Sequence, residues 1–225
     1  MRLPARLVIG FSLLLALAGA VGWGLFIRER RQNDVVRENR RLQEALSRLG
    51  NEFRVADIVV TGRTGGRGRE ARTTFRFHEY DRFLNPLPPR EFTVAGDVAY
   101  FDALVLKFED SWVGAGDPLR GRSLHLFRRV FGEYQAPADG FPIDAAGEDG
   151  VPDALRVGAG EFERSLWKRF WEFTADPDAA AKEGVRVAQG EAVYLRLEVG
   201  RTYRLTIEAD GGLNLKAAPI STARN

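Results

Sequence analysis

Few residues of this chain have side chains suited to acid–base or nucleophilic chemistry. The 225 residues include no cysteine and only two histidines, which excludes disulfide frameworks, thiolate metal sites and cysteine nucleophiles. In the segment "FRFHEYD", His78 and Asp81 could act together as a base and its carboxylate partner in a hydrolase. No nucleophile elbow, phosphate loop or metal-binding motif accompanies them. His78 and Asp81 are therefore weak candidates for catalysis, and an enzyme is the less favoured interpretation.

A long acidic segment is the second place where a chemical site is conceivable. Residues 135–160 contain five acids, five glycines and three prolines, and loops of this length are usually functional or disordered. The EF-hand spacing is broken because Ala146 occupies a ligand position, so we expect a solvated flap, no bound metal and no cofactor. The carboxylates that would form a cation site are Asp144, Glu148, Asp149 and Asp153.

An aromatic helix is the third candidate site. In "GEFERSLWKRFWEF", residues 160–173, apolar side chains recur at helical spacing on one face, with Trp167 and Trp171 one turn apart beside it. Core packing accounts for most of such a face, but the aromatic content exceeds what one face must bury. We therefore treat Trp167 and Trp171 as candidate contacts with a protein partner or with the bilayer.

The elements that position these residues are those of an α+β domain over residues 53–218, followed by a C-terminal tail at 219–225. Asp117 and Pro118 suit a helix start, and an apolar stripe follows them, which predicts a helix within 117–134 and puts His125 at its rim. We expect one antiparallel sheet covered on one face by that helix and the helix at 160–173. The expected strands at 53–62 and 71–81 join as a hairpin through the loop at 63–70, and residues 91–110 give one or two further strands that turn at Gly96-Asp97. The expected strands at 192–199, 202–209 and 213–217 form a meander. A short helix, capped by Asp176, is expected at 175–184.

Residues 7–27, "LVIGFSLLLALAGAVGWGLFI", carry no charge and follow a short basic tail at 1–6. At 1.5 Å per residue this run spans about 31 Å as a helix, which matches a hydrocarbon core of about 30 Å. It predicts a transmembrane helix that acts as a signal anchor. A signal peptide cleaved after Ala20 is the alternative, since Ala18-Gly19-Ala20 resembles a cleavage site, but the apolar run continues past it.

Two arguments on the orientation of the anchor conflict. Six arginines between Arg28 and Arg41 follow the span, against Arg2, Arg6 and the terminal amine before it, which favours a cytoplasmic domain. The basic start is also typical of an uncleaved signal anchor, which exports the rest of the chain. We expect a single-pass protein whose globular domain is extracytoplasmic.

Beyond the span, residues 28–50 have a heptad pattern that predicts a coiled-coil stalk. The d positions are Val35, Leu42 and Leu49, and the a positions include Asn39 and Leu46. A single asparagine at an a position favours a parallel, two-stranded register, which is the arrangement of two helices rising from one bilayer. A helix that simply packs on its own domain is the alternative.

Charge distribution excludes one class of partner. Residues 1–54 hold ten arginines against five acids, which leaves 23 basic and 26 acidic residues in the other 171. A mildly acidic domain lacks the basic surface that nucleic-acid binding needs. We expect a structural or interaction protein of the cell envelope that is integral to the membrane and forms a parallel homodimer, with a further protein partner conceivable. A ligand-binding or sensory domain is the alternative.

Overall fold

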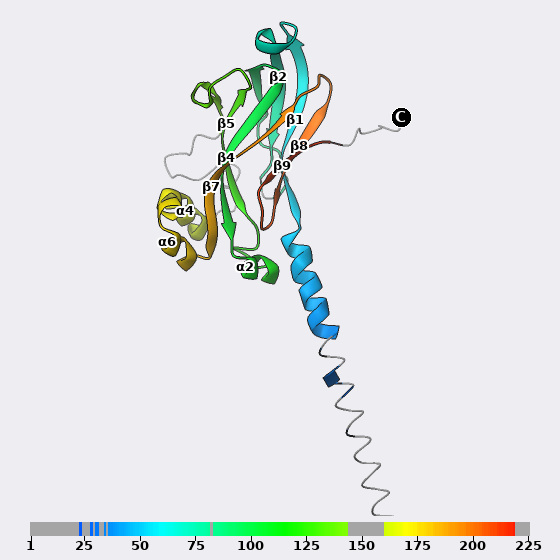
Figure 1. Ribbon diagram of the computed structural model, residues 1–225, viewed down its shortest axis with the longest axis vertical. Helices are drawn as coiled ribbons and strands as arrows, with labels where there is room; N and C mark the ends of the chain where they lie inside the picture. The colour runs from blue at the N-terminus through cyan, green and yellow to red at the C-terminus, as the bar shows by residue number, and fades with distance from the viewer. Residues whose placement is uncertain are drawn as a thin grey trace, which may run out of the picture. The chain divides into compact units, whose positions relative to one another are not determined.

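The computed structural model describes residues 36–81, 83–143 and 160–218, together with a few single positions between 23 and 34 (Figure 1). The chain divides into two compact units, Met1–Glu44 and Ala45–Asn225. The second unit has an α+β fold with two antiparallel sheets and few helices. The predicted fold class is confirmed at this level, and the single predicted sheet is wrong.

The first sheet has five strands in the order β3-β2-β1-β8-β9. The predicted hairpin of the first two strands is confirmed, since β1 and β2 pair over most of their length, with a bulge between Val60 and Gly62. The strands are β1 (Glu52–Thr64), β2 (Arg72–Glu79), β3 (Arg90–Ala95), β8 (Thr202–Glu208) and β9 (Leu213–Ala217).

The second sheet has four strands in the order β6-β5-β4-β7. Its centre is β4, which pairs with β5 on one side and β7 on the other. The strands are β4 (Val98–Phe108), β5 (Leu124–Gly132), β6 (Phe141–Pro142) and β7 (Val185–Arg196).

The two sheets pack face to face around an aromatic core. Phe77 of the first sheet stacks on Phe101 of the second at 6.0 Å between ring centroids and meets Phe127 edge-on at 5.3 Å. Phe75 lies 5.8 Å from the same Phe101 ring. All four rings are fully buried, so this contact fixes the two sheets against each other.

Helices cover the outer face of the second sheet and build a second core. Residues on alternate sides of β4 enter different cores, so that Ala103 and Val105 face the first sheet, whereas Leu104 and Leu106 face the helices. Leu166 and Phe170 reach that second core from the helices. The helices are α4 (Glu161–Lys168), α5 (Phe170–Ala175) and α6 (Pro177–Lys182), with α2 (Asp110–Ala115) at the end of β4 (Figure 1).

The helix predicted within 117–134 is wrong, because these residues form a turn and then β5. The carboxylate of Asp117 accepts hydrogen bonds from the backbone amides of Leu119 and Arg120, so its predicted capping role exists but closes a turn. A register shift between Asp102 and Ala103 on β4 changes the phase of β5 after Phe127. This bulge turns a two-residue period into the three-residue step from Phe127 to Val130, which resembles a helical stripe.

The predicted C-terminal meander is only half correct. β8 and β9 form the expected hairpin, but β7 pairs with β4 and belongs to the other sheet. The chain also changes sheets between β3 and β4, at Gly96, whose φ of +103° suits glycine. The periodicity of a strand indicates which of its faces is buried, but it does not indicate which sheet the strand joins. The same strand pattern therefore fits one sheet or two.

The predicted stalk is helical over residues 36–49. The span predicted at 7–27 and the start of the stalk lie outside the described residues apart from single positions. Among the residues that are described, no helix is long and apolar enough to cross a membrane.

Candidate functional site

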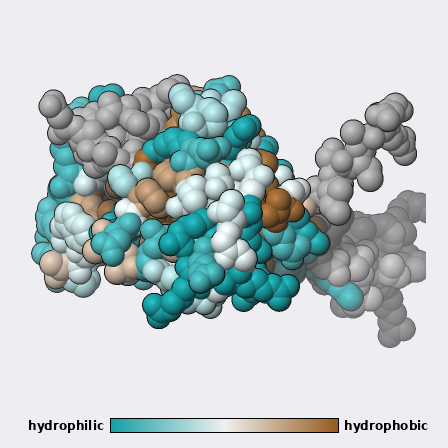
Figure 2. Space-filling view, turned by 90° about the horizontal axis from the view of Figure 1, so that it is seen from above, coloured by the Kyte–Doolittle hydropathy of each residue, from teal (hydrophilic) through white to brown (hydrophobic). Residues whose placement is uncertain are grey.

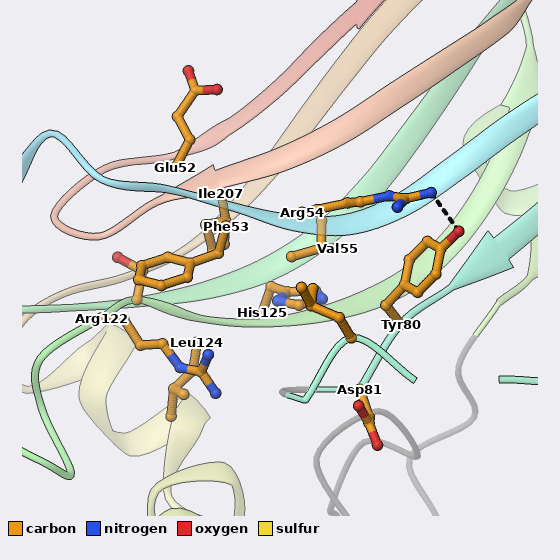
Figure 3. Close-up of a pocket in the computed structure, with 12 residues that line it drawn as sticks. Glu52, Phe53, Arg54, Val55, Tyr80, Asp81, Arg122, Leu124, His125 and Ile207 are labelled. Carbon is orange, nitrogen blue, oxygen red and sulfur yellow. Dashed lines mark hydrogen bonds between the residues drawn. The ribbon is translucent and has the colours of Figure 1, made fainter. Parts of the chain in front are cut away.

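The end of the sandwich where β1 and β5 begin holds a cavity of about 350 Å³. We name this cavity the end pocket. Its wall is mostly apolar, and it takes side chains from the start of β1, the residues after β2, the start of β5 and the end of β8 (Figure 3). The lining residues are Glu52, Phe53, Arg54, Val55, Tyr80, Asp81, Leu84, Arg122, Ser123, Leu124, His125 and Ile207.

His125 is the chemically distinctive residue of the end pocket. Its exposed fraction is 7%, and ring atom Nε2 is buried with no hydrogen-bond partner among the residues that the structure describes. Burial, assisted by the positive charge of Arg122, lowers the pKa of His125 to about 4. The imidazole is therefore neutral at neutral pH, which suits a ring buried beside an apolar wall.

One side of the pocket is bounded by a polar cluster that starts at Arg54. Its guanidinium donates to the Tyr80 hydroxyl at 2.5 Å, as the dashed line in Figure 3 marks, and forms an ion pair with Asp57. Arg204 Nε also donates to Asp57, at 3.3 Å. Burial, followed by the negative charge of Asp57, raises the pKa of Tyr80. The tyrosine thus stays protonated, and the carboxylate of Asp57 is shared between the guanidiniums of Arg54 and Arg204.

The proposed catalytic residues His78 and Asp81 occupy different surroundings. His78 lies on β2 opposite Asp57 in the register with β1. Asp81 is buried, and its carboxylate accepts hydrogen bonds from the backbone amides of Phe83 and Asn85 at 2.8 and 2.9 Å. This carboxylate stabilises its own loop, which is a structural use of the group.

Metal binding finds no support in the described part of the chain, where no cluster of three histidine or acidic side chains has the geometry to hold an ion. The four acids proposed as calcium ligands, Asp144, Glu148, Asp149 and Asp153, lie outside the described residues.

The two tryptophans proposed as partner contacts differ in exposure. Trp171 on α5 is 64% exposed, whereas Trp167 on α4 is 6% exposed and stacks on Phe170 with ring centroids 5.9 Å apart. Both line a groove of about 560 Å³ between these helices and the outer face of the second sheet. Of the pair, Trp171 has the exposure that a contact with a partner requires.

The stalk residues proposed as an interface also divide into two groups. Leu42 and Leu46 are 52% and 67% exposed, and Asn39 is exposed as well. Leu49 is half-buried and packs against the core beneath the helices, where Phe53 joins it. Val35 lies outside the described residues. The last turn of the predicted coiled coil therefore belongs to the domain, which shortens the seam that remains for a partner.

Sequence reasoning missed the end pocket because it placed β5 as a helix and His125 at its rim. A signal was present in "SLHLF", where a histidine stands between leucines in a run that suits a buried strand. The phase change after Phe127 obscured that signal.

In comparisons with protein-family models, with curated proteins and with solved structures, nothing matches this chain. The geometry of the described residues is therefore the basis for assigning a function.

Proposed function

We propose that this chain is a single-pass membrane protein that presents its α+β domain on a dimeric coiled-coil stalk, outside the cytoplasm, in a structural or assembly role at the cell envelope. Residues 7–27 serve as the anchor and the heptads after them as the stalk. The role needs no catalytic centre, which agrees with the structural use of Asp81.

The observation that carries this proposal is the exposure of Leu42 and Leu46. Both stand at core positions of the heptad pattern, and each leaves more than half of its side chain in water in the single chain. Pairing of two copies would bury these leucines, at about 1.5–3 kcal/mol for each side chain fully removed from water. Asn39, one turn before Leu42, is the residue that would select a parallel pair.

The attachment of the stalk to the domain supports a role in presentation. Arg48 Nη1 donates a hydrogen bond of 2.8 Å to the carbonyl oxygen of Gly114 on α2, and Leu49 packs on the adjacent core. A Cβ on Gly114 would lie 3.3 Å from that of Ala45, so the two backbones approach closely. The last helical residues, from Ala45 to Leu49, are therefore part of the packing of the domain itself.

The surface of the domain is consistent with a protein that is presented on a stalk without aggregating. On the face that Figure 2 shows, the coloured residues are mostly hydrophilic, and hydrophobic residues occur there in small separate patches. Such a surface avoids non-specific association.

Cysteine cross-linking in native membranes tests the stalk, and the natural absence of cysteine makes the background clean. Leu42→Cys and Leu46→Cys each place one thiol on the proposed seam. In a parallel dimer the two copies of either thiol face each other, so mild oxidation should give a disulfide-linked dimer in high yield. Glu44→Cys is the matched control, because the heptad pattern puts position 44 on the outside of the helix pair.

Equal yields at positions 42, 44 and 46 would indicate random collision, and no dimer at 42 or 46 would remove the coiled coil.

A ligand-binding domain on the same anchor is the second candidate, and the observation that favours it is the end pocket, lined in part by His125, whose Nε2 has no hydrogen-bond partner among the described residues. Pockets of this kind, apolar with a few polar groups, are typical of small-molecule sites.

A further inference from the structure

The groove beside the two tryptophans has an apolar floor, and we name it the tryptophan groove. It lies between the outer face of the second sheet and the helices α4 and α5, with a volume of about 560 Å³. Leu104 and Leu126 of the sheet and Phe170 of α5 are buried and form the floor. Trp167 and Trp171 are also part of the lining.

Trp171 is the exposed aromatic side chain of this groove. Its ring meets that of Phe170 edge-on, with centroids 5.2 Å apart, yet the residue leaves most of its surface in water. Tryptophan and arginine are the residue types most enriched among those that dominate the binding energy of protein interfaces. An apolar side chain that entered the groove would be covered by the Trp171 ring.

The lining of the tryptophan groove is positively charged. It contains the side chains of Arg128, Arg129 and Lys168, and none of the described residues that line it is acidic. Asp102 lies 3.2 Å from Arg129 and 3.8 Å from Arg128 and compensates one of these charges. Asp139 belongs to the turn beside the groove without lining it. Even with both acids counted, one positive charge is in excess among the described residues.

Lys168 is the most accessible of the three cations. It is exposed in the last turn of α4 and forms no ion pair with any residue in the described part of the chain. Residues 55–225 together carry 23 basic and 26 acidic side chains, so the groove is a positive site on a mildly acidic domain. Complementary charge selects the partner and its orientation at an interface, and the complement of this groove is acidic.

We propose that the tryptophan groove binds an acidic segment of a partner protein, whose apolar side chains enter beside Trp171 and whose carboxylates lie against Lys168 and Arg128. A concave site fits a chain segment, as in helix-in-groove recognition, whereas a flat bilayer would not reach the floor. This inference rests on the assembly role proposed above and names the chemistry of the partner. It does not use the stalk, so the cross-linking test and the test of the groove can fail separately.

Fluorescence anisotropy on the full chain in phosphatidylcholine nanodiscs tests the groove. The probe is a labelled peptide in which leucines at helical spacing alternate with glutamates. One control peptide has lysines in place of the glutamates, and the other has serines in place of the leucines. We expect the acidic peptide to bind about tenfold or more tightly than either control, and to weaken about tenfold between roughly 0.05 M and 0.5 M salt.

Two variants assign the contacts. Trp171→Ala should weaken the acidic peptide about tenfold or more, as the loss of a dominant interface ring does. Lys168→Glu should weaken it to a similar extent and reduce its dependence on salt. The matched controls are Tyr194→Ala on β7 and Lys182→Glu on α6, both exposed and outside the groove, and both should bind the peptide as the original chain does.

Two other occupants would give different results. Association with added phosphatidylglycerol vesicles that is lost in both Trp171→Ala and Lys168→Glu would assign this face to a membrane. Peptide binding seen only in the Asp144→Asn/Glu148→Gln/Asp149→Asn/Asp153→Asn variant would show that the chain's own acids, which lie outside the described residues, occupy the groove. Either result would overturn the proposal, as would equal affinity for the lysine peptide or no binding of the acidic peptide to the unaltered chain.

Discussion

The ring of His125 meets the ring of Phe127 edge-on, with centroids 4.9 Å apart. Phe127 in turn meets Phe77 of the opposite sheet, which makes His125 an extension of the aromatic core towards the end pocket. An imidazole in this position is favoured in its neutral form, and this gives the stability of the domain a pH dependence.

The first prediction concerns that pH dependence. The pKa of His125 is about 4 in the folded chain, below the value of 6.5 for an exposed histidine, so the unfolded state binds more protons between these values. The contribution of neutral His125 to the free energy of unfolding is therefore complete above pH 6.5, and it is lost as the pH drops towards 4. Between pH 7.5 and 5 the free energy of unfolding should fall by about 2 kcal/mol through this group, measured by urea unfolding with pulse proteolysis.

Two substitutions isolate the histidine responsible. His78→Asn should leave the pH profile unchanged, whereas His125→Phe should flatten it between pH 7.5 and 5. A profile of the same slope in the His125→Phe variant would assign the effect to other groups and contradict the neutral, buried state of His125.

The second prediction concerns the contact between the sheets. Phe77→Ala removes a fully buried ring that touches both Phe101 and Phe127, and should lower the free energy of unfolding by about 3–5 kcal/mol. Tyr194→Ala, at an exposed aromatic on β7, is the control and should cost less than about 1 kcal/mol. Urea unfolding of the two variants should differ accordingly, and equal losses would contradict the packing of the two sheets.

The third prediction separates the two tryptophans. Trp167 is buried and Trp171 exposed, so Trp167→Ala should destabilise the domain by about 3–5 kcal/mol and Trp171→Ala by less than about 1 kcal/mol. If Trp171 contacts a partner protein, Trp171→Ala should reduce co-purification from native membranes while leaving the unfolding curve in place. A large loss of stability in Trp171→Ala would show that its ring is part of the core.

Two elements of the domain could be predicted from local sequence patterns. The β1–β2 hairpin was predictable because Phe75 and Phe77 alternate with polar residues on a sheet with one face in the core. The cap at Asp176 was predictable because its chemistry is local, and its carboxylate does accept from the amides of Asp178 and Ala179.

β5 and the end pocket were not predictable by the same reasoning. Leu124 through Phe127 are all buried because β5 is covered by the first sheet on one face and by helices on the other, which removes the alternation that marks a strand. The end pocket also combines residues far apart in the chain, such as Val55 and Leu124, and no local pattern brings those together.

The fourth prediction concerns orientation. Arg67 lies in the exposed loop between β1 and β2, so Arg67→Cys gives a single accessible thiol in a chain without cysteine. An extracytoplasmic domain should react with a membrane-impermeant maleimide in intact cells as fully as after lysis. Labelling only after lysis would place the domain in the cytoplasm, as the arginines that come after the span suggest.

The central claim is that two copies associate through the stalk, and counting subunits in native membrane vesicles tests it most directly. Fluorophore-tagged chains should photobleach in two steps, and the Leu42→Asp/Leu46→Asp variant should bleach in one step, because charges at seam positions prevent pairing. A matched Arg40→Asp/Glu44→Arg variant, changed outside the seam, should retain two steps. Single-step bleaching of the unaltered chain would contradict the dimeric stalk.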